Sequence, residues 1–259
     1  MTAFSLSWRP VALVLSLGLL AGCEQAASVA GAAAGEAATG AVAGAASGPA
    51  GQAAGAAAQA AATPAAQQLA VLTAAAAQGA WDRIADATIA ACTGDADKTC
   101  AEAHALRARA CRRRAATAPQ DQRARYRDCA VASGQAALAA GGANTQPERN
   151  AWREELLAAL FDRRAVTPRA GICPDNDLMR AEADRLLQDA PGNASARFHG
   201  ASARMLGVSV ACGADDQRCP DLAQAARLLT PPQTADQRWM QTLEGVRTLQ
   251  RVVVGCPES

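Results

Sequence analysis

The sequence is poor in lysine, histidine and aromatic residues, and each shortage limits the structures and functions that the chain can have. Of the 25 basic residues only Lys98 is a lysine, and the formal net charge is +1. No overall charge therefore draws the chain toward nucleic acid or an anionic membrane surface. His104 and His199 are the only histidines, which argues against a metal centre rich in imidazole ligands. Phe, Trp and Tyr make up 3% of the residues, so we expect a thin core.

Catalytic signatures are also missing. The chain contains no Gly-x-Ser-x-Gly nucleophile turn, no His-Glu-x-x-His zinc motif and no glycine-rich nucleotide-binding loop. The acidic stretches 95–97 and 215–216 are too short for the ligand spacing of a calcium loop, so we interpret them as polar turns. A lone histidine on a helix is more often structural than catalytic. The sequence therefore predicts a protein that is not an enzyme and that uses no cofactor or metal.

The N-terminal segment has the pattern of a secretory signal. A single positive charge, Arg9, is followed by an apolar run from Val11 to Leu20. Such a run is too short to span a bilayer as a helix, whereas it has the length of the apolar region of a signal peptide. We therefore expect residues 1–22 to be a signal peptide and the rest of the chain to be exported.

The end of this segment resembles the lipobox of bacterial lipoproteins. The residues are Leu20-Ala21-Gly22-Cys23. By this resemblance, signal peptidase II would cut before Cys23, and Cys23 would carry a thioether-linked diacylglycerol and an acylated amine (palmitate as one acyl group). Several acyl chains give stable membrane anchoring where one does not. Glu24 follows in place of the aspartate that retains such proteins in the inner membrane, so we expect anchoring in the outer membrane, facing the periplasm. The alternative is an ordinary signal peptide with an incidental cysteine.

Residues 23–62 form a segment of low complexity after the anchor. They are almost entirely Ala, Gly, Ser, Thr and Gln, with glycines four residues apart between Gly40 and Gly48. One interpretation is a glycine-zipper helix that packs against a partner or a membrane. Glu36 and the pair Gly48-Pro49 oppose it, so a flexible tether that spaces the domain from the membrane is favoured.

The cysteines indicate disulfides. Eight cysteines remain after Cys23, and an even number in an exported domain implies bridges. Cysteines seven or eight residues apart cannot be bridged within one helix, because their Cα atoms would lie roughly 10–12 Å apart, but they can meet across a turn. Zinc is the rival interpretation, which the lack of Cys-x-x-Cys weakens. The spacing predicts the bridges Cys92–Cys100, Cys111–Cys129, Cys212–Cys219 and, least directly, Cys173–Cys256.

Residues 63–259 show helical periodicity throughout. Apolar residues recur at spacings of three and four, and strand-like alternation is absent. Proline, glycine and cap residues divide the pattern into helices. The sequence predicts an all-α domain with nine helices, at about 63–79, 81–92, 100–118, 120–140, 147–164, 177–190, 194–211, 220–229 and 234–254.

These paired helices resemble two families of helical repeats. Residues 79–85 and 186–194 resemble the turns of tetratricopeptide repeats, and residues 225–232 resemble the end of such a repeat. The segments 91–100 and 211–219 are similar to the cysteine-bridged hairpins of Sel1-like repeats in exported bacterial proteins. No clean 34-residue period is kept. The resemblance implies an α-solenoid-like stack of helical hairpins over residues 65–254, stapled by disulfides.

Arginines gather between residues 100 and 130. This segment contains eight arginines and only three acidic residues. A basic hairpin of this kind could dock an acidic protein or lipid phosphates, and the alternative is a set of solvated helix faces. The candidate partner-binding residues are Arg107, Arg112, Arg113, Arg114, Arg123 and Arg127.

Helical-repeat stacks usually provide binding surfaces, although architecture alone does not set function. The sequence favours a non-enzymatic outer-membrane lipoprotein whose periplasmic domain binds a protein partner as an envelope or secretion scaffold. One alternative is an immunity lipoprotein that neutralises a toxin acting in the periplasm. Another is a small-ligand-binding component of a solute-uptake system. Nucleic acid is not an expected partner.

Overall fold

The computed structural model describes residues 64–230, 236–252 and 256. The predicted signal peptide, Cys23 and the predicted tether lie outside this range, as does the predicted start of the first helix at Thr63. The described residues form nine α-helices and three short 3-10 turns, and they contain no strand. The helices are α2 (Pro64–Ala77), α3 (Trp81–Ala85), α4 (Lys98–Thr117), α5 (Gln120–Ala140), α6 (Gln146–Arg164), α7 (Ile172–Asp189), α8 (Ala194–Val210), α9 (Arg218–Leu229) and α10 (Gln237–Val252).

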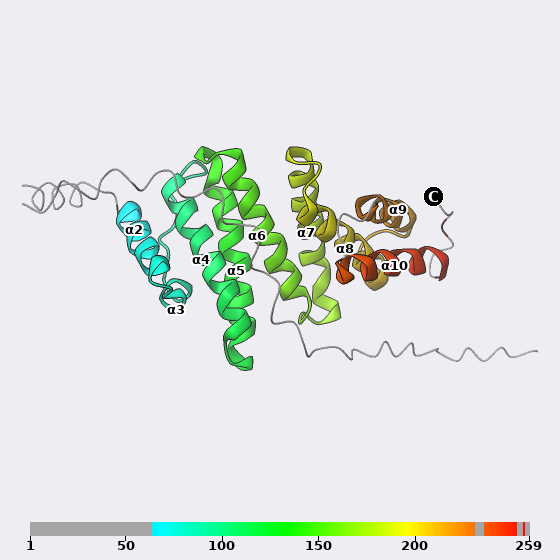
Figure 1. The fold of residues 1–259 in the computed structure, drawn as a ribbon, viewed down its shortest axis with the longest axis horizontal. Helices are drawn as coiled ribbons and strands as arrows, with labels where there is room; N and C mark the ends of the chain where they lie inside the picture. Colours follow the sequence, from blue (N-terminus) through cyan, green and yellow to red (C-terminus); the bar gives the residue numbers. More distant parts are fainter. Residues whose placement is uncertain (1–63, 231–235, 253–255, 257–259) are drawn as a thin grey trace, which may run out of the picture. The chain divides into compact units, whose positions relative to one another are not determined.

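The helices stack in the order of the chain (Figure 1). From α4 onward each helix packs against the next one, and α2, α4, α6, α8 and α10 also contact one another along one side of the stack. Contacts between sequence neighbours and between every second helix are the pattern of a solenoid. The prediction of an all-α, solenoid-like stack of hairpins with disulfides is confirmed. Among the described residues, no helix is both long and apolar enough to cross a membrane.

Local signals explain most of the helix ends. Pro119 stops α4 and lets α5 begin, because proline lacks the N–H that a helix interior needs. At the start of α6, the Glu148 carboxylate accepts hydrogen bonds from the backbone N–H and the hydroxyl of Thr145, at 2.7 and 2.9 Å. Asn193 caps α8 by accepting from the N–H of Ala196 at 2.8 Å. These ends were therefore predictable to within one or two residues.

The core is built mainly from small side chains. Alanine supplies many of its fully buried positions, and the large aliphatic residues are spread over several helices; on α6, Leu156, Leu157 and Leu160 are at most 1% exposed. Alanine lets helices approach closely, but it removes little apolar area from water. Two apolar clusters result, one over α2–α8 and one over α8–α10. Phe198 connects them, with ring centroids 5.7 Å from Phe161 and 6.2 Å from Trp239.

A buried arginine ties three helices together. Arg164, at the end of α6, donates to Asn176 of α7 at 3.1 Å and to Ser202 of α8 at 2.7 Å. Asn176 in turn donates to the carbonyl oxygen of Ala203 at 2.7 Å. Burial lowers the pKa of Arg164 to about 10, although the charge of Asp175 opposes this. The guanidinium thus costs free energy to bury, and its hydrogen bonds offset that cost while fixing how α6, α7 and α8 meet.

The predicted helix over residues 81–92 is too long. α3 ends at Ala85, and an irregular segment leads to α4. The side chain of Gln68 on α2 pairs with this segment by donating to the Thr88 carbonyl at 2.5 Å and accepting from the Ala90 N–H at 3.4 Å. Thr88 and Ile89 are β-branched and disfavour helix. Tertiary hydrogen bonds therefore replace the helical ones that periodicity had suggested.

Two of the four predicted disulfide pairings are wrong. Cys92–Cys100 and Cys111–Cys129 are present as expected, with Cα atoms 5.5 and 5.8 Å apart. The others are Cys173–Cys212 and Cys219–Cys256, each with Cα atoms 5.4 Å apart, so the predicted Cys212–Cys219 and Cys173–Cys256 bridges do not form. In an antiparallel hairpin the start of the first helix lies beside the end of the second, and each of these bridges closes one hairpin there.

Both hairpins begin in the same way. α7 starts at Ile172, five residues before the expected Asp177, and its first turn holds Cys173-Pro174-Asp175. The first turn of α9 holds Cys219-Pro220-Asp221. Proline is tolerated at such a position because the first four N–H groups of a helix have no partner within it. The repeated Cys-Pro-Asp marks α7–α8 and α9–α10 as equivalent units.

A close backbone approach holds the irregular segment before α4. The N–H of Gly142 donates to the carbonyl oxygen of Asp95 at 2.7 Å. A Cβ atom at residue 142 would lie 2.6 Å from that same oxygen. We therefore expect Gly142→Ala to lower the free energy of unfolding by about 2 kcal/mol, as overpacking does elsewhere. Urea unfolding followed by circular dichroism measures this. Gly192→Ala, where nothing lies within 4 Å, is the control, and equal stability of the two variants would contradict the close approach.

Candidate functional site

A polar groove runs between α4 and α6, on the side of the stack where the even-numbered helices meet. Its volume is about 390 Å³. The lining residues come only from these two helices and are Arg109, Arg112, Arg113, Ala116, Glu155 and Asp162. Three cations and two carboxylates thus face one hollow, so the groove suits a polar ligand or a segment of a partner protein.

Arg112 forms the floor of this groove by joining the two helices. Its guanidinium lies 3.1 Å from Asp162 and 3.3 Å from Glu155. Burial lowers the pKa of Arg112, but the two carboxylates outweigh burial and raise the pKa above its ordinary value. Arg112 therefore stays charged and cross-links α4 to α6. Each carboxylate already faces a cation, so the groove does not present a free pair of acids for general acid–base chemistry.

The arginines at the rim of the groove are paired with acids less than Arg112 is. Arg113 is exposed and its guanidinium lies 4.1 Å from the ring centroid of Trp81, a contact that positions the side chain without neutralising it. Arg109 is exposed, and the described residues offer it no ion pair or hydrogen bond. The three arginines and two carboxylates that line the groove sum to a charge of +1, and Arg109 and Arg113 place this positive charge at the rim.

The other predicted partner-binding arginines do not line the groove. Arg114 pairs with Asp82 of α3 at 2.9 Å. Arg123 donates to the carbonyl oxygen of Ala118 at 2.9 Å, which closes the turn before α5. Arg127 is half-buried on α5, away from the groove lining. The structure therefore brings together only Arg112 and Arg113 of the predicted set, and it adds Arg109.

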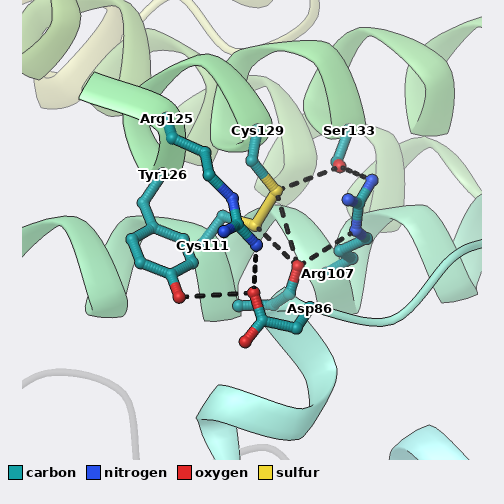
Figure 2. Close-up of a disulfide and its surroundings, with 8 residues drawn as sticks. Asp86, Arg107, Cys111, Arg125, Tyr126, Cys129 and Ser133 are labelled. Atoms are coloured by element: carbon teal, nitrogen blue, oxygen red, sulfur yellow. Dashed lines mark hydrogen bonds and ion pairs between the residues drawn. A yellow bond between two sulfur atoms is a disulfide. The ribbon is translucent and has the colours of Figure 1, made fainter. Parts of the chain in front are cut away.

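Arg107 belongs to the surroundings of the Cys111–Cys129 disulfide (Figure 2). It donates to the carbonyl oxygen of Ala85 at 3.4 Å and to the Ser133 hydroxyl at 3.3 Å. Both sulfur atoms also lie near that carbonyl oxygen, at 3.6 and 3.9 Å. Burial lowers the pKa of Arg107. This residue therefore anchors the end of α3 to the hairpin of α4 and α5, and it is not free to dock a partner.

Contacts with α5 also hold the end of α3 in place. The Asp86 carboxylate, just after α3, lies 2.5 Å from the Arg125 guanidinium and accepts from the Tyr126 hydroxyl at 3.3 Å (Figure 2). Arg125 also lies over the Tyr126 ring, 5.2 Å from its centroid. The arginine clustering in the sequence thus reflects many separate ion pairs across helices more than one basic patch.

A histidine lies behind the groove on α8. His199 sits between Phe161 and Phe198, with ring centroids 5.5 and 5.3 Å away. Its Nδ1 lies 2.8 Å from the Ser195 carbonyl oxygen, and since a carbonyl only accepts, Nδ1 carries the proton. Burial lowers the pKa of His199 to about 4, helped by the charges of Arg164 and Arg112. The ring is therefore a neutral structural residue at pH 7.

A second groove of about 300 Å³ lies between α5, α6 and α7. Its charged residues are Arg153, Glu182 and Arg185, and Arg153 and Arg185 both pair with Glu182. These charged side chains pair with one another, so this groove has less unpaired charge for a partner to bind than the first groove has.

One group of side chains among the described residues could hold a metal ion. Atoms of Cys92, Cys100 and His104 lie within 4.8 Å of one another. The two sulfur atoms are joined in a disulfide, and a disulfide sulfur is not the thiolate that binds metal. In the acidic loop 95–97, Asp97 caps α4 by accepting from the Cys100 N–H at 3.1 Å.

Comparison with protein-family models, curated proteins and solved structures finds no match to this chain. Sequence reasoning found Arg112 and Arg113, but it missed the acids that define the groove, because Glu155 and Asp162 lie 43 and 50 residues from Arg112 along the chain. The one signal in the sequence was the spacing of these acids by seven residues, two turns on one helix face.

Proposed function

We propose that the protein is an outer-membrane lipoprotein, without enzymatic activity, whose helical domain binds a protein partner on the periplasmic side of the membrane. The address rests on the lipobox-like residues 20–23 and on Glu24. The disulfides support it, because bridges persist in oxidising compartments such as the periplasm. Four bridges join all eight cysteines of the helical domain.

The observation that carries partner binding is the groove between α4 and α6. In its floor Arg112 pairs with Glu155 and Asp162, and its rim holds Arg109 and Arg113 without acidic partners among the described residues, so the lining has a net charge of +1. Positive charge left at the edge of a polar hollow fits an acidic segment of a partner, whose carboxylates would pair with the guanidinium groups. The stack of helices supports the same proposal, since stacked helices provide extended binding faces.

Site-specific photo-crosslinking tests the groove. A photoreactive residue at Ala116, which is exposed in the groove, is expected to capture a partner in envelope fractions. The same residue at Ala132, exposed on α5 and outside the groove lining, should not. Identification of the crosslinked peptide by mass spectrometry should place an acidic segment at Ala116.

Two matched charge reversals decide whether the rim carries the binding. Arg109→Glu is expected to reduce crosslinking at Ala116 by roughly tenfold, equivalent to about 1.4 kcal/mol, because a like charge would face the acidic segment. Arg127→Glu makes the same change of charge on α5 and should leave recovery unchanged. If both variants recover the partner as well as the wild type does, the groove is not the binding site.

A further inference from the structure

We propose that Cys92, Cys100 and His104 form a zinc-binding site when the disulfide between the two cysteines is reduced. Each of these three residues has a potential ligand atom within 4.8 Å of the others. Two thiolates and one imidazole are ligands that Zn²⁺ prefers, and a water molecule would complete a tetrahedral site. The proposal does not depend on the groove or on partner binding.

His104 has a nitrogen available for this role. Its Nδ1 is buried and has no hydrogen-bond partner among the described residues, whereas a buried polar atom normally has one. This nitrogen can therefore bind a metal ion without giving up a hydrogen bond. Its position four residues after Cys100 places both on one face of α4.

The turn that carries the cysteines is held by bonds other than the disulfide. Asp97 accepts from the backbone N–H and the hydroxyl of Thr93, at 3.1 and 2.9 Å, and from the Cys100 N–H at 3.1 Å. These bonds join the residue after Cys92 to Cys100 itself. They also lower the pKa of Asp97, with the backbone bond from Thr93 as the largest cause. The two thiols should thus remain close to each other and to His104 after the S–S bond is broken.

The chemistry balances with an external dithiol as reductant. The dithiol gives two electrons and two protons to the S–S bond and becomes a cyclic disulfide, while Cys92 and Cys100 become thiols. Binding of Zn²⁺ then releases both thiol protons to solvent. Cys92 and His104 are half-buried and Cys100 is 4% exposed, so the ion would reach the site past Cys92 and His104.

Zinc titration of the purified protein tests the proposal, before and after a mild reduction that opens the Cys92–Cys100 bridge while circular dichroism shows that the helices remain folded. The readout is competition with a chromophoric chelator, in the absence of oxygen and of excess dithiol. Reduced wild type is expected to bind one more equivalent of Zn²⁺ tightly than reduced His104→Asn does. His104→Asn removes no thiol, so Zn²⁺ bound by the other cysteines is the same in both. The difference in affinity should exceed about tenfold, since even loss of an outer-shell partner of a metal costs about 10–100-fold.

Two further variants make the result decisive. Cys92→Ser should show the same loss after reduction as His104→Asn, and the combined Cys173→Ser and Cys212→Ser variant, which removes thiols elsewhere, should retain the tight site. Co²⁺ bound in place of Zn²⁺ should show thiolate charge-transfer absorption in wild type that is weaker in Cys92→Ser. Equal Zn²⁺ binding by reduced wild type and His104→Asn would overturn the proposal, and so would equal binding before and after reduction.

Discussion

Replacing Cys173 and Cys212 together by serine is expected to lower the free energy of unfolding by about 4 kcal/mol. The bridge joins residues 39 apart, and the chain entropy that a cross-link removes from the unfolded state grows with the length of the loop it closes. A core rich in alanine has little other stabilisation to compensate. Urea unfolding under non-reducing conditions measures the change.

The Cys92–Cys100 bridge provides the comparison. It closes a loop of only 8 residues, so the matching pair of serine substitutions should cost about 2.5 kcal/mol by the same relation. Thiol titration of the Cys173→Ser, Cys212→Ser variant is the control for pairing. The structure predicts no free thiol in its helical domain, whereas a Cys212–Cys219 bridge in the native protein would leave two cysteines unpaired. Equal destabilisation by both pairs of substitutions would contradict the loop-length argument.

Acidification from pH 7 to pH 4 is expected to remove about 3 kcal/mol of stability through His199 alone. Burial lowers the pKa of this histidine from 6.5 to about 4 in the folded protein. Between these values the unfolded chain binds a proton that the folded chain does not, so stability rises with pH across this window and falls as the pH decreases from 6.5 toward 4. Protonation would place a positive charge among Phe161, Phe198 and two arginines.

His199→Gln isolates this effect, since glutamine stays neutral at every pH and can still donate to the Ser195 carbonyl. Carboxylates titrate in the same range, so the measured quantity is the difference in unfolding free energy between wild type and variant at each pH. That difference should change by about 3 kcal/mol between pH 7 and pH 4. His104→Gln is the control and should follow the wild type more closely, because His104 is less buried. Parallel pH profiles for wild type and His199→Gln would refute the assignment.

The sequence predicted the helices best where it carries explicit stop signals. α5 spans Gln120–Ala140 as expected, because Pro119 precedes it and glycines 141 and 142 follow. The prediction from the sequence failed at α3, where the side chain of Gln68 forms hydrogen bonds with the backbone of residues 88 and 90. No residue close to this segment in the sequence indicates that these hydrogen bonds form. Periodicity reports which face is apolar, but it does not report a polar contact from another helix.

The disulfide pairing failed for a related reason. Spacing alone favours bridges across short turns, and Cys212 and Cys219 flank such a turn. The structure shows instead that cysteines at the two ends of one hairpin meet. The repeated Cys-Pro-Asp at 173–175 and 219–221 is the signal that would have identified two equivalent hairpins. Equivalent units use equivalent bridges, which excludes a bond between the end of one unit and the start of the next.

The groove, like the disulfide pairing, could be predicted only in part from the sequence. Arginine clustering on α4 was visible, but whether each guanidinium is free or paired depends on acids from α3 and α6. Arg112 and Arg114 are committed to such acids, whereas Arg109 is not. Candidate binding residues are therefore the charges that the fold leaves unpaired.

Peptide mapping of the protein purified from membranes, digested without reduction, tests most directly the claim that disulfides staple an exported, lipid-anchored stack of helices. The account predicts four cross-linked peptide pairs, Cys92–Cys100, Cys111–Cys129, Cys173–Cys212 and Cys219–Cys256, together with an acylated N-terminal peptide that begins at Cys23. Free thiols at these eight positions, or an uncleaved leader ahead of an unmodified Cys23, would contradict it.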